Sequence, residues 1–205
     1  MQLDFNRIKN KQRIFIGGNS GTDEILNIIS HSLKYLKKPF DMLSNGKGEI
    51  TDAPIIIFNG LNDLNPETGK AYFHDMKPHI ALFHKIVEPV PEGYSSFEEF
   101  INQFEMLANG LPKAGTFLYY QSDNVSLMIG KNERQDVRNI EYTKFKNKKT
   151  GDTTTLEFKS GEKATIKTIK KGFSGEVAAA FNLVNRLSVK EKHFIKSIQN
   201  YQPGV

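Results

Sequence analysis

Two short runs of nearly continuous apolar residues constrain the fold of this chain more than any other feature. They cover residues 54–58 (PIIIF) and 79–83 (HIALF). A strand with one solvated face alternates apolar and polar residues, whereas a parallel strand covered on both faces gives an almost unbroken apolar run. We therefore expect two central strands of a mostly parallel sheet with helices on both faces, which is an α/β fold.

A strand, a glycine loop and a helix are predicted at the start of the chain. Residues 13–17 (RIFIG) form a β-branched and aromatic run that meets a glycine loop, and a helical pattern begins near Thr22. The apolar positions of that helix recur at the spacing of one face: Ile25, Ile28, Ile29, Leu33 and Leu36.

The remaining helices are predicted from capping residues, and the remaining strands from short apolar runs. Ser96 with Glu99 three residues later is typical of a capping box at a helix start, and Ser188 with Glu191 predicts the same for the last helix. Residues 115–121 (GTFLYYQ) and 125–130 (VSLMIG) are interpreted as strands because they are short, apolar and rich in β-branched or aromatic residues.

A basic β-ribbon is predicted at about residues 141–170. Between Lys144 and Lys171 the chain has nine lysines and three acids, a local charge of +6, while the whole chain carries +5. The alternation of apolar and polar residues predicts an antiparallel excursion in which Leu156 and Phe158 are buried on one face and Lys159 points outward. We interpret the lysines as a solvated face that discourages edge pairing, so nucleic acid is not an expected partner. Polyanion binding by the ribbon is the alternative.

Composition limits the classes of function. With 205 residues and 38% hydrophobic content, residues 1–205 can form one domain with one core. The absence of cysteine excludes disulfides, thiolate metal sites and cysteine nucleophiles. No apolar run approaches the length of a membrane span, so no membrane partner is expected and the cytoplasm is the expected location.

The order of segments resembles the central, nucleotide-binding domain of the Mur ligases. The glycine loop is followed in turn by APIIIFNG, KPHIALF, SSFEEFINQF, KAGTFLYY and LSVKEKHFIKSIQNY. The similarity covers almost the whole chain, and its nearest branch comprises the UDP-N-acetylmuramate:alanine and muramate:tripeptide ligases. It implies an ATP-dependent acid–amino-acid ligase fold, with ATP and Mg²⁺ as the cofactors of the family.

The glycine loop departs from the pattern that this resemblance implies. In the family, Lys and Thr follow the last glycine, so that the Lys holds phosphate and the hydroxyl holds Mg²⁺. Here Thr22 stands in place of the Lys and Asp23 in place of the hydroxyl residue, and Glu24 adds a second carboxylate to the first helical turn. We interpret the loop as vestigial; its residues are Gly18, Asn19, Ser20, Gly21, Thr22 and Asp23.

Three further family sites also depart. Asn59 stands where the family has a metal-binding Glu, with Asp63 close by, which predicts a vestigial acidic site. Pro89 and Val90 occupy the places of an Asp-His pair, and residues 172–175 (GFSG) replace an Asn-bearing motif near the adenine. The expectation is that ATP and Mg²⁺ binding are lost and that no catalytic residue remains.

The remaining polar residues offer one further candidate pocket. His84 and Glu88 follow an apolar strand, at the edge where open α/β sheets bind ligands, and form a candidate pocket. His74, Asp75 and His79 precede them, yet a satisfied core histidine is commoner than a ligand, and no metal site is expected. The motifs Gly-x-Ser-x-Gly and His-Glu-x-x-His are absent from the sequence.

Two functional hypotheses follow. The first is a non-catalytic Mur ligase-like protein that binds or regulates in peptidoglycan metabolism, with an unknown protein partner or small ligand and an unknown oligomeric state. The alternative is a nucleotide-binding subunit of a Mur-type ligase, completed by a partner chain, in which Lys47 or Lys70 replaces the missing cation. We expect neither a UDP-binding domain before the matched segments nor a C-terminal ligase domain after them.

Overall fold

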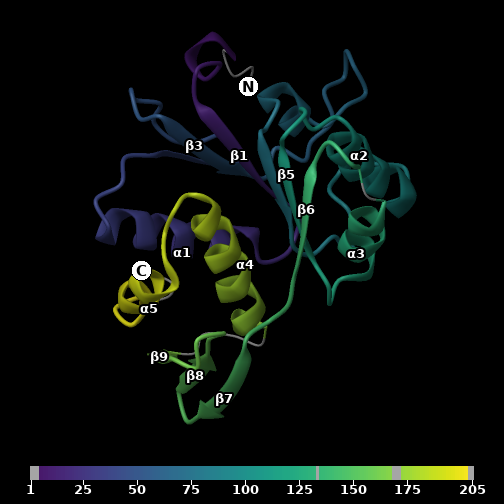
Figure 1. Ribbon diagram of the computed structural model, residues 1–205. Coiled ribbons are helices and arrows are strands. Elements are labelled where there is room, and N and C mark those ends of the chain that lie inside the picture. The colour runs from purple at the N-terminus through teal and green to yellow at the C-terminus, as the bar shows by residue number, and fades with distance from the viewer. Residues whose placement is uncertain (1–4, 133, 168–171, 203–205) are drawn as a thin grey trace. The chain divides into compact units, whose positions relative to one another are not determined.

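The computed structural model describes residues 5–132, 134–167 and 172–202 and is shown in Figure 1. Its packing divides the chain into two units. The first consists of Met1–Asp23 and Pro39–Glu141, and the second of Glu24–Lys38 and Tyr142–Val205. The expectation of a single domain over residues 1–205 stays a prediction. Among the described helices, none has the length and apolar character needed to span a bilayer.

The first unit contains a six-stranded sheet in the order β2-β3-β1-β4-β5-β6, counted over the described residues. The pairings of β2 with β3, β3 with β1, β1 with β4, and β4 with β5 are all parallel. The predicted mostly parallel α/β fold is therefore confirmed. The strands are β1 (Gln12–Gly17), β2 (Asp41–Ser44), β3 (Ile55–Asn59), β4 (Ile80–Phe83), β5 (Thr116–Tyr120) and β6 (Arg138–Tyr142).

The central strands are buried along successive residues, as the apolar runs predict. All four residues of β4 and the last five of β1 are buried, which requires cover on both faces of the sheet. On one face, Phe15 stacks on Phe58 with ring centroids 5.1 Å apart and on Phe73 at 4.8 Å. Phe104 of α2 (Phe97–Asn109) joins this aromatic core through Phe83, at 5.2 Å.

Helix α2 begins at the predicted cap. Ser96 Oγ accepts a hydrogen bond from the Glu99 amide at 3.1 Å. The reciprocal half of the capping box differs, because the Glu99 carboxylate accepts from the amide and hydroxyl of Ser95, each at 2.7 Å. The segment Tyr72–Met76 forms a short 3₁₀ helix, η2, which no sequence pattern predicts, and Phe5–Arg7 forms another, η1.

The predicted strand at residues 125–130 is wrong, because this segment lies in helix α3 (Asn124–Lys131). Asp123 caps the helix by accepting a hydrogen bond from the Ser126 amide at 2.8 Å. A Cβ on Gly130 would lie 2.2 Å from the Tyr119 ring, so this glycine permits α3 to pack directly on β5. In Figure 1, α3 and α2 lie beside each other next to β5 and β6.

The second unit contains the predicted ribbon. Strands β7 (Lys146–Thr150), β8 (Thr153–Glu157) and β9 (Lys163–Lys167) pair antiparallel in that order. Leu156 and Phe158 are buried and Lys159 is exposed, so the predicted register is confirmed. Phe158 packs on Phe181 of α4 (Phe173–Arg186) with ring centroids 5.9 Å apart.

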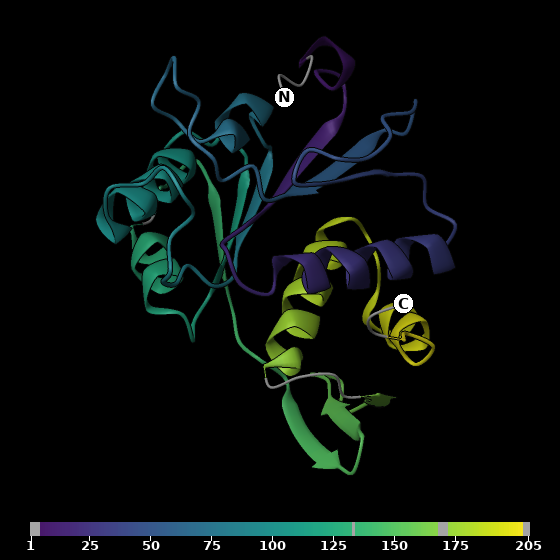
Figure 2. The same cartoon turned by 180° about the vertical axis from the view of Figure 1, so that it is seen from behind.

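Helices α1 (Thr22–Tyr35) and α5 (Glu191–Ile198) also contribute to the second unit (Figure 2). Ser32 and Ser197 join their facing sides through a hydroxyl–hydroxyl bond of 2.9 Å. The predicted Ser188–Glu191 cap is wrong, because Lys190 is the N-cap residue of α5 and makes no side-chain cap. The Glu191 carboxylate instead accepts a hydrogen bond from the Ser160 amide in the ribbon turn, at 3.2 Å.

Candidate functional site

The candidate site lies at the carboxyl ends of β1 and β4. These strands are neighbours at the centre of the sheet. The strands that follow β1 in the chain, β2 and β3, lie on one side of this pair, and β5, which follows β4, lies on the other side. Such a reversal of direction opens a crevice that open α/β sheets use for ligands. The Gly17 carbonyl at the end of β1 accepts a hydrogen bond from the His84 amide at 3.1 Å, so the loops after both strands begin side by side.

The glycine loop is closely packed against the loop that follows β4. The Asn19 amide donates to the Lys85 carbonyl at 2.9 Å, and Ser20 forms an antiparallel bridge with Lys85. Gly18 has φ +123°, and a Cβ there would lie 2.4 Å from the Lys85 carbonyl oxygen. A side chain at position 18 is therefore excluded both by backbone conformation and by space.

The Asn19 side chain is bonded entirely within the protein. Its amide nitrogen donates to the carbonyls of Val87 and Pro89, the latter at 3.1 Å, and its oxygen accepts from the Val87 amide at 2.9 Å. Residues 87–89 thus lie against the glycine loop. The segment predicted to replace the family's Asp-His pair is brought to the site, but it contributes backbone carbonyls there.

A hydrogen-bond network links the two predicted vestigial sites. The Asn59 amide, at the end of β3, donates to the Asp23 carboxylate at 2.6 Å and lies 3.4 Å from the Thr22 hydroxyl. The Ser44 hydroxyl, at the end of β2, donates to the same Asp23 oxygen at 3.1 Å. Asn59 and Thr22 are buried, whereas Asp23 is exposed. The loop therefore presents a carboxylate to solvent, held in place by two neutral donors.

Asp63, the other residue of the predicted acidic site, is exposed and lies outside this network. Its neighbour Asn62 donates from its side chain to the Gly18 carbonyl at 3.3 Å. The Asn62 carbonyl accepts from the Tyr94 hydroxyl. Burial, with smaller contributions from Asp63 and Glu99, raises the pKa of Tyr94, so its phenol stays protonated and donates at neutral pH.

His84 and Glu88, the residues of the predicted pocket, lie in different surroundings, and the pocket itself stays a prediction. His84 is fully buried and stacks on Tyr120 with ring centroids 4.6 Å apart, whereas Glu88 is exposed. Stacking of this kind is the arrangement of a core histidine. Within the ranges that the structure describes, no group of three or more His, Asp or Glu side chains is arranged to hold a metal ion.

Asp123 is a site residue that the sequence analysis missed. It is buried at the carboxyl end of β5, where it caps α3. Burial raises the pKa of Asp123, against the opposing effects of hydrogen bonds from the Ser126 and Ile86 amides and of the nearby Lys85 charge. Asp-Asn-Val-Ser directly before an apolar run is an N-cap pattern, and that signal identifies both the residue and the helix.

Searches against protein-family models and against curated proteins find no match. Solved structures do match. A UDP-N-acetylmuramate:L-alanyl-gamma-D-glutamyl-meso-diaminopimelate ligase from Neisseria meningitides has a TM-score of 0.76 and 9% identity, over 97% of this chain and 68% of that one. MurF from Acinetobacter baumannii has a TM-score of 0.78 and 12% identity, over 97% and 48%. MurC from Thermotoga maritima has 0.71 and 13%, over 96% and 47%.

These similarities show that the chain has a Mur ligase central-domain-like fold. The chain spans about half the length of the MurF and MurC structures that it matches, 48% and 47% respectively. At 9–13% identity the likeness describes the path of the backbone. The chemistry of this chain depends on its own side chains.

Proposed function

We propose that this chain is a non-catalytic, Mur ligase-like binding protein of peptidoglycan metabolism, acting in the cytoplasm, whose glycine loop does not hold Mg-ATP. The observation that supports this proposal is the hydrogen bond of 2.6 Å between Asp23 and Asn59. By the resemblance, these two positions carry the hydroxyl residue and the glutamate that hold Mg²⁺ in the family.

The chemistry of this pair is unfavourable for Mg-ATP. Mg²⁺ prefers carboxylate oxygens or water, and Asn59 directs its amide nitrogen, not its oxygen, towards Asp23. The exposed Asp23 carboxylate repels a triphosphate, and Thr22 supplies no cation in place of the family's lysine. The loop amide of Asn19 already donates to Lys85. The anion-binding character of a helix N-terminus is therefore opposed by charge and reduced by internal bonds.

The ligand class that we propose is a UDP-N-acetylmuramyl peptide, alone or presented by a partner protein. The support is the fold shared with ligases whose names specify UDP-N-acetylmuramate and its peptides. A domain that has lost nucleotide chemistry can still recognise the substrate or the protein that its relatives contact, because binding surfaces and catalytic residues occupy different positions on a fold.

Calorimetry with three separate titrants tests the proposal. We expect heat on titration with a UDP-N-acetylmuramyl tripeptide and none with Mg-ATP or Mg-ADP at millimolar concentration. The absence of heat with UDP-N-acetylmuramyl alanine, tripeptide and pentapeptide would refute the ligand class. A saturable Mg-ATP isotherm that ADP competes would refute the loss of nucleotide binding.

A nucleotide-binding subunit completed by a partner chain is the second candidate, and one observation favours it. Lys47 lies in the turn after β2, where its carbonyl accepts a hydrogen bond from the Ser44 amide at 2.9 Å. Because the Ser44 hydroxyl contacts Asp23, the exposed Lys47 belongs to a turn that borders the glycine loop. Lys47→Gln would lower Mg-ATP affinity about tenfold under this alternative, whereas Lys70→Gln would not.

A further inference from the structure

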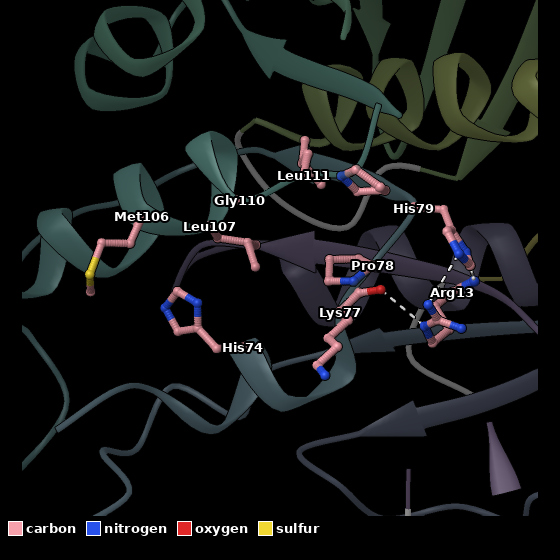
Figure 3. Close-up of a pocket in the computed structure, with 10 residues that line it drawn as sticks. Arg13, His74, Lys77, Pro78, His79, Met106, Leu107, Gly110 and Leu111 are labelled. Atoms are coloured by element: carbon pink, nitrogen blue, oxygen red, sulfur yellow. Dashed lines mark hydrogen bonds between the residues drawn. The ribbon is translucent and has the colours of Figure 1, made fainter. Parts of the chain in front are cut away.

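A pocket lies at the amino ends of the strands of the first unit, whereas the glycine loop lies at their carboxyl ends. It has a volume of about 340 Å³ and is lined by ten residues (Figure 3). They come from the start of β1, from η2 and the segment that follows it, and from the end of α2 and the loop beyond it. This size falls within the range of small-molecule sites. Arg13 is the second residue of β1 and His79 precedes β4, so the pocket lies at the amino ends of these strands.

Arg13 places a buried positive charge beside this pocket. Only 6% of the residue is exposed. Its guanidinium donates to four backbone carbonyls and lies 3.1 Å from Nε2 of His79 and 5.1 Å from the centre of the Phe5 ring. The carbonyls are those of Ile8 and Lys11, each at 3.3 Å, Lys9 at 2.8 Å and Lys77 at 2.9 Å. Among the described residues, no carboxylate lies within ion-pair distance of it. A buried charge balanced only by carbonyl and ring dipoles is attractive to an anion.

Lys77 adds a second positive charge to the lining of the pocket, whereas its two histidines are neutral. Lys77 lines it with an ammonium group that lies 5.0 Å from the Phe5 ring centre, also without a carboxylate in the described ion pairs. Burial, and for His79 the neighbouring Arg13 charge, lowers the pKa of His74 and His79, so both rings are neutral at pH 7. The lining contains no acidic residue.

The buried Nε2 of His74 has no hydrogen-bond partner among the described residues. This atom belongs to a ring that lines the pocket on the side of Met106, as Figure 3 shows. A buried polar atom of this kind is stabilised when a ligand supplies its partner. The pocket therefore contains one buried polar atom without a hydrogen bond, on His74, and one buried charge without a counterion, on Arg13.

The remaining wall is apolar. It is formed at the end of α2 by Met106 and Leu107 and beyond it by Leu111. The carbonyls of this helix end do not compete for the cations, because the Gly110 amide donates to Met106 at 2.9 Å and the Arg134 guanidinium donates to the Leu111 carbonyl at 2.8 Å. An apolar wall opposite two cations suits an amphipathic anion.

We propose that this pocket binds a small monocarboxylate, with the carboxylate at Arg13 and Lys77 and the hydrocarbon body against Met106, Leu107 and Leu111. The site is independent of the proposed function, because it lies at the amino ends of the strands and the glycine loop at their carboxyl ends. None of its lining residues belongs to that loop.

Calorimetry or NMR titration with acetate, butyrate, hexanoate and hexanamide tests the proposal. We expect affinity to rise from acetate to hexanoate, and hexanoate to bind about tenfold to a hundredfold more tightly than its uncharged amide. Equal affinity for hexanoate and hexanamide would refute the carboxylate site. Inorganic phosphate binding as tightly as hexanoate would show an unselective cationic surface and would also refute it.

A matched pair of variants at Met106 assigns the binding to this pocket. Met106 is half-buried, and Glu and Gln are similar in size and are both good helix formers, so Met106→Glu and Met106→Gln differ mainly in charge. We expect Met106→Glu to weaken hexanoate binding at least about tenfold relative to Met106→Gln. Lys77, at φ 44°, is changed to Asn, which tolerates this conformation, and Lys77→Asn should also weaken hexanoate binding. Binding that neither Met106→Glu nor Lys77→Asn changes would overturn the proposal.

Discussion

Asn59→Asp is the most direct test of the hydrogen-bond network among Asp23, Asn59 and Ser44. The variant replaces the buried amide that donates to Asp23 over 2.6 Å with an isosteric carboxylate. It removes a hydrogen bond to a charged group, worth about 1.5 to 3 kcal/mol, and sets two carboxylates face to face. Because Asp23 is exposed, water screens part of the repulsion. We therefore expect a loss of about 2 kcal/mol in the free energy of unfolding near pH 7, below the cost of breaking a fully buried pair.

The pH dependence of this loss has a defined sign. The Asp23 carboxylate raises the folded-state pKa of the carboxyl group introduced at position 59 above its unfolded value, because two like charges face each other. A raised carboxyl pKa costs no stability below the unfolded value of about 3.9, and the cost grows as the pH rises towards the folded value. The variant should therefore match the wild type at about pH 4 and fall below it at neutral pH.

Urea denaturation at the two pH values, with and without millimolar MgCl₂, measures this effect. Mg²⁺ should restore part of the stability of Asn59→Asp, because the new carboxylate pair offers the ion hard oxygen ligands. The control is Asn102→Asp on the exposed face of α2, which adds the same charge and should change stability by less than about 0.5 kcal/mol. An Asn59→Asp protein as stable as the wild type at neutral pH would refute the description of the network.

Two further predictions concern the first unit. Gly18→Ala should lower the free energy of unfolding, measured by urea denaturation, by roughly 3 kcal/mol, because its Cβ would lie 2.4 Å from the Lys85 carbonyl oxygen. The control Gly69→Ala meets no atom within 4 Å and should cost about 1 kcal/mol. Equal costs would contradict the loop geometry. Burial opposes the ionisation of Asp41, yet hydrogen bonds from Lys11 and Thr51 outweigh this effect and lower the Asp41 pKa. The ionised Asp41 carboxylate therefore stabilises the fold above about pH 4, and this stabilisation is lost as the pH falls through the folded-state pKa. Asp41→Asn removes the carboxylate that lies 2.9 Å from the buried Lys11 ammonium, which keeps its hydrogen bonds to the Thr51 and Ala53 carbonyls. It should cost about 3 kcal/mol at neutral pH and less at about pH 2. A loss that does not vary with pH would contradict this assignment.

The sheet was largely predictable from the sequence because its central strands are apolar on both faces. Residues 54–58 and 79–83 could form little else, and they became β3 and β4. β2 (DMLS) was not predicted, since four residues with two polar side chains give no periodic signal. Its place in the sheet depends on long-range contacts, above all the buried ion pair of 2.9 Å between Asp41 and Lys11, which no local pattern encodes.

The error at α3 has a physical origin in the ambiguity of short apolar segments. VSLMIG has the composition of a strand, and its length does not distinguish the two structures. The Asp123 cap and the close approach of Gly130 to Tyr119 decide in favour of the helix. The cap is visible in the sequence, whereas the contact with Tyr119 depends on β5 being in place.

The positions of the candidate site were predictable, but their partners were not. The resemblance identified Asp23 and Asn59 as separate departures, and the fold places their side chains 2.6 Å apart. The Ser44 hydroxyl, the third member of the network, follows a strand that the sequence did not reveal. The Arg13 pocket was missed as well, because an arginine at the start of a strand resembles any edge residue until its burial is known.

Titration of the wild-type protein with Mg-ATP in a calorimeter tests the central claim most directly. Removal of the lysine contact alone weakens binding about tenfold to a hundredfold, and the Asp23 charge and the Asn59 amide add to that loss. The variant that combines Thr22→Lys, Asp23→Thr and Asn59→Glu is the positive control and should show measurable heat. We predict a flat trace for the wild type at millimolar Mg-ATP. A saturable wild-type isotherm that ADP competes would contradict the account.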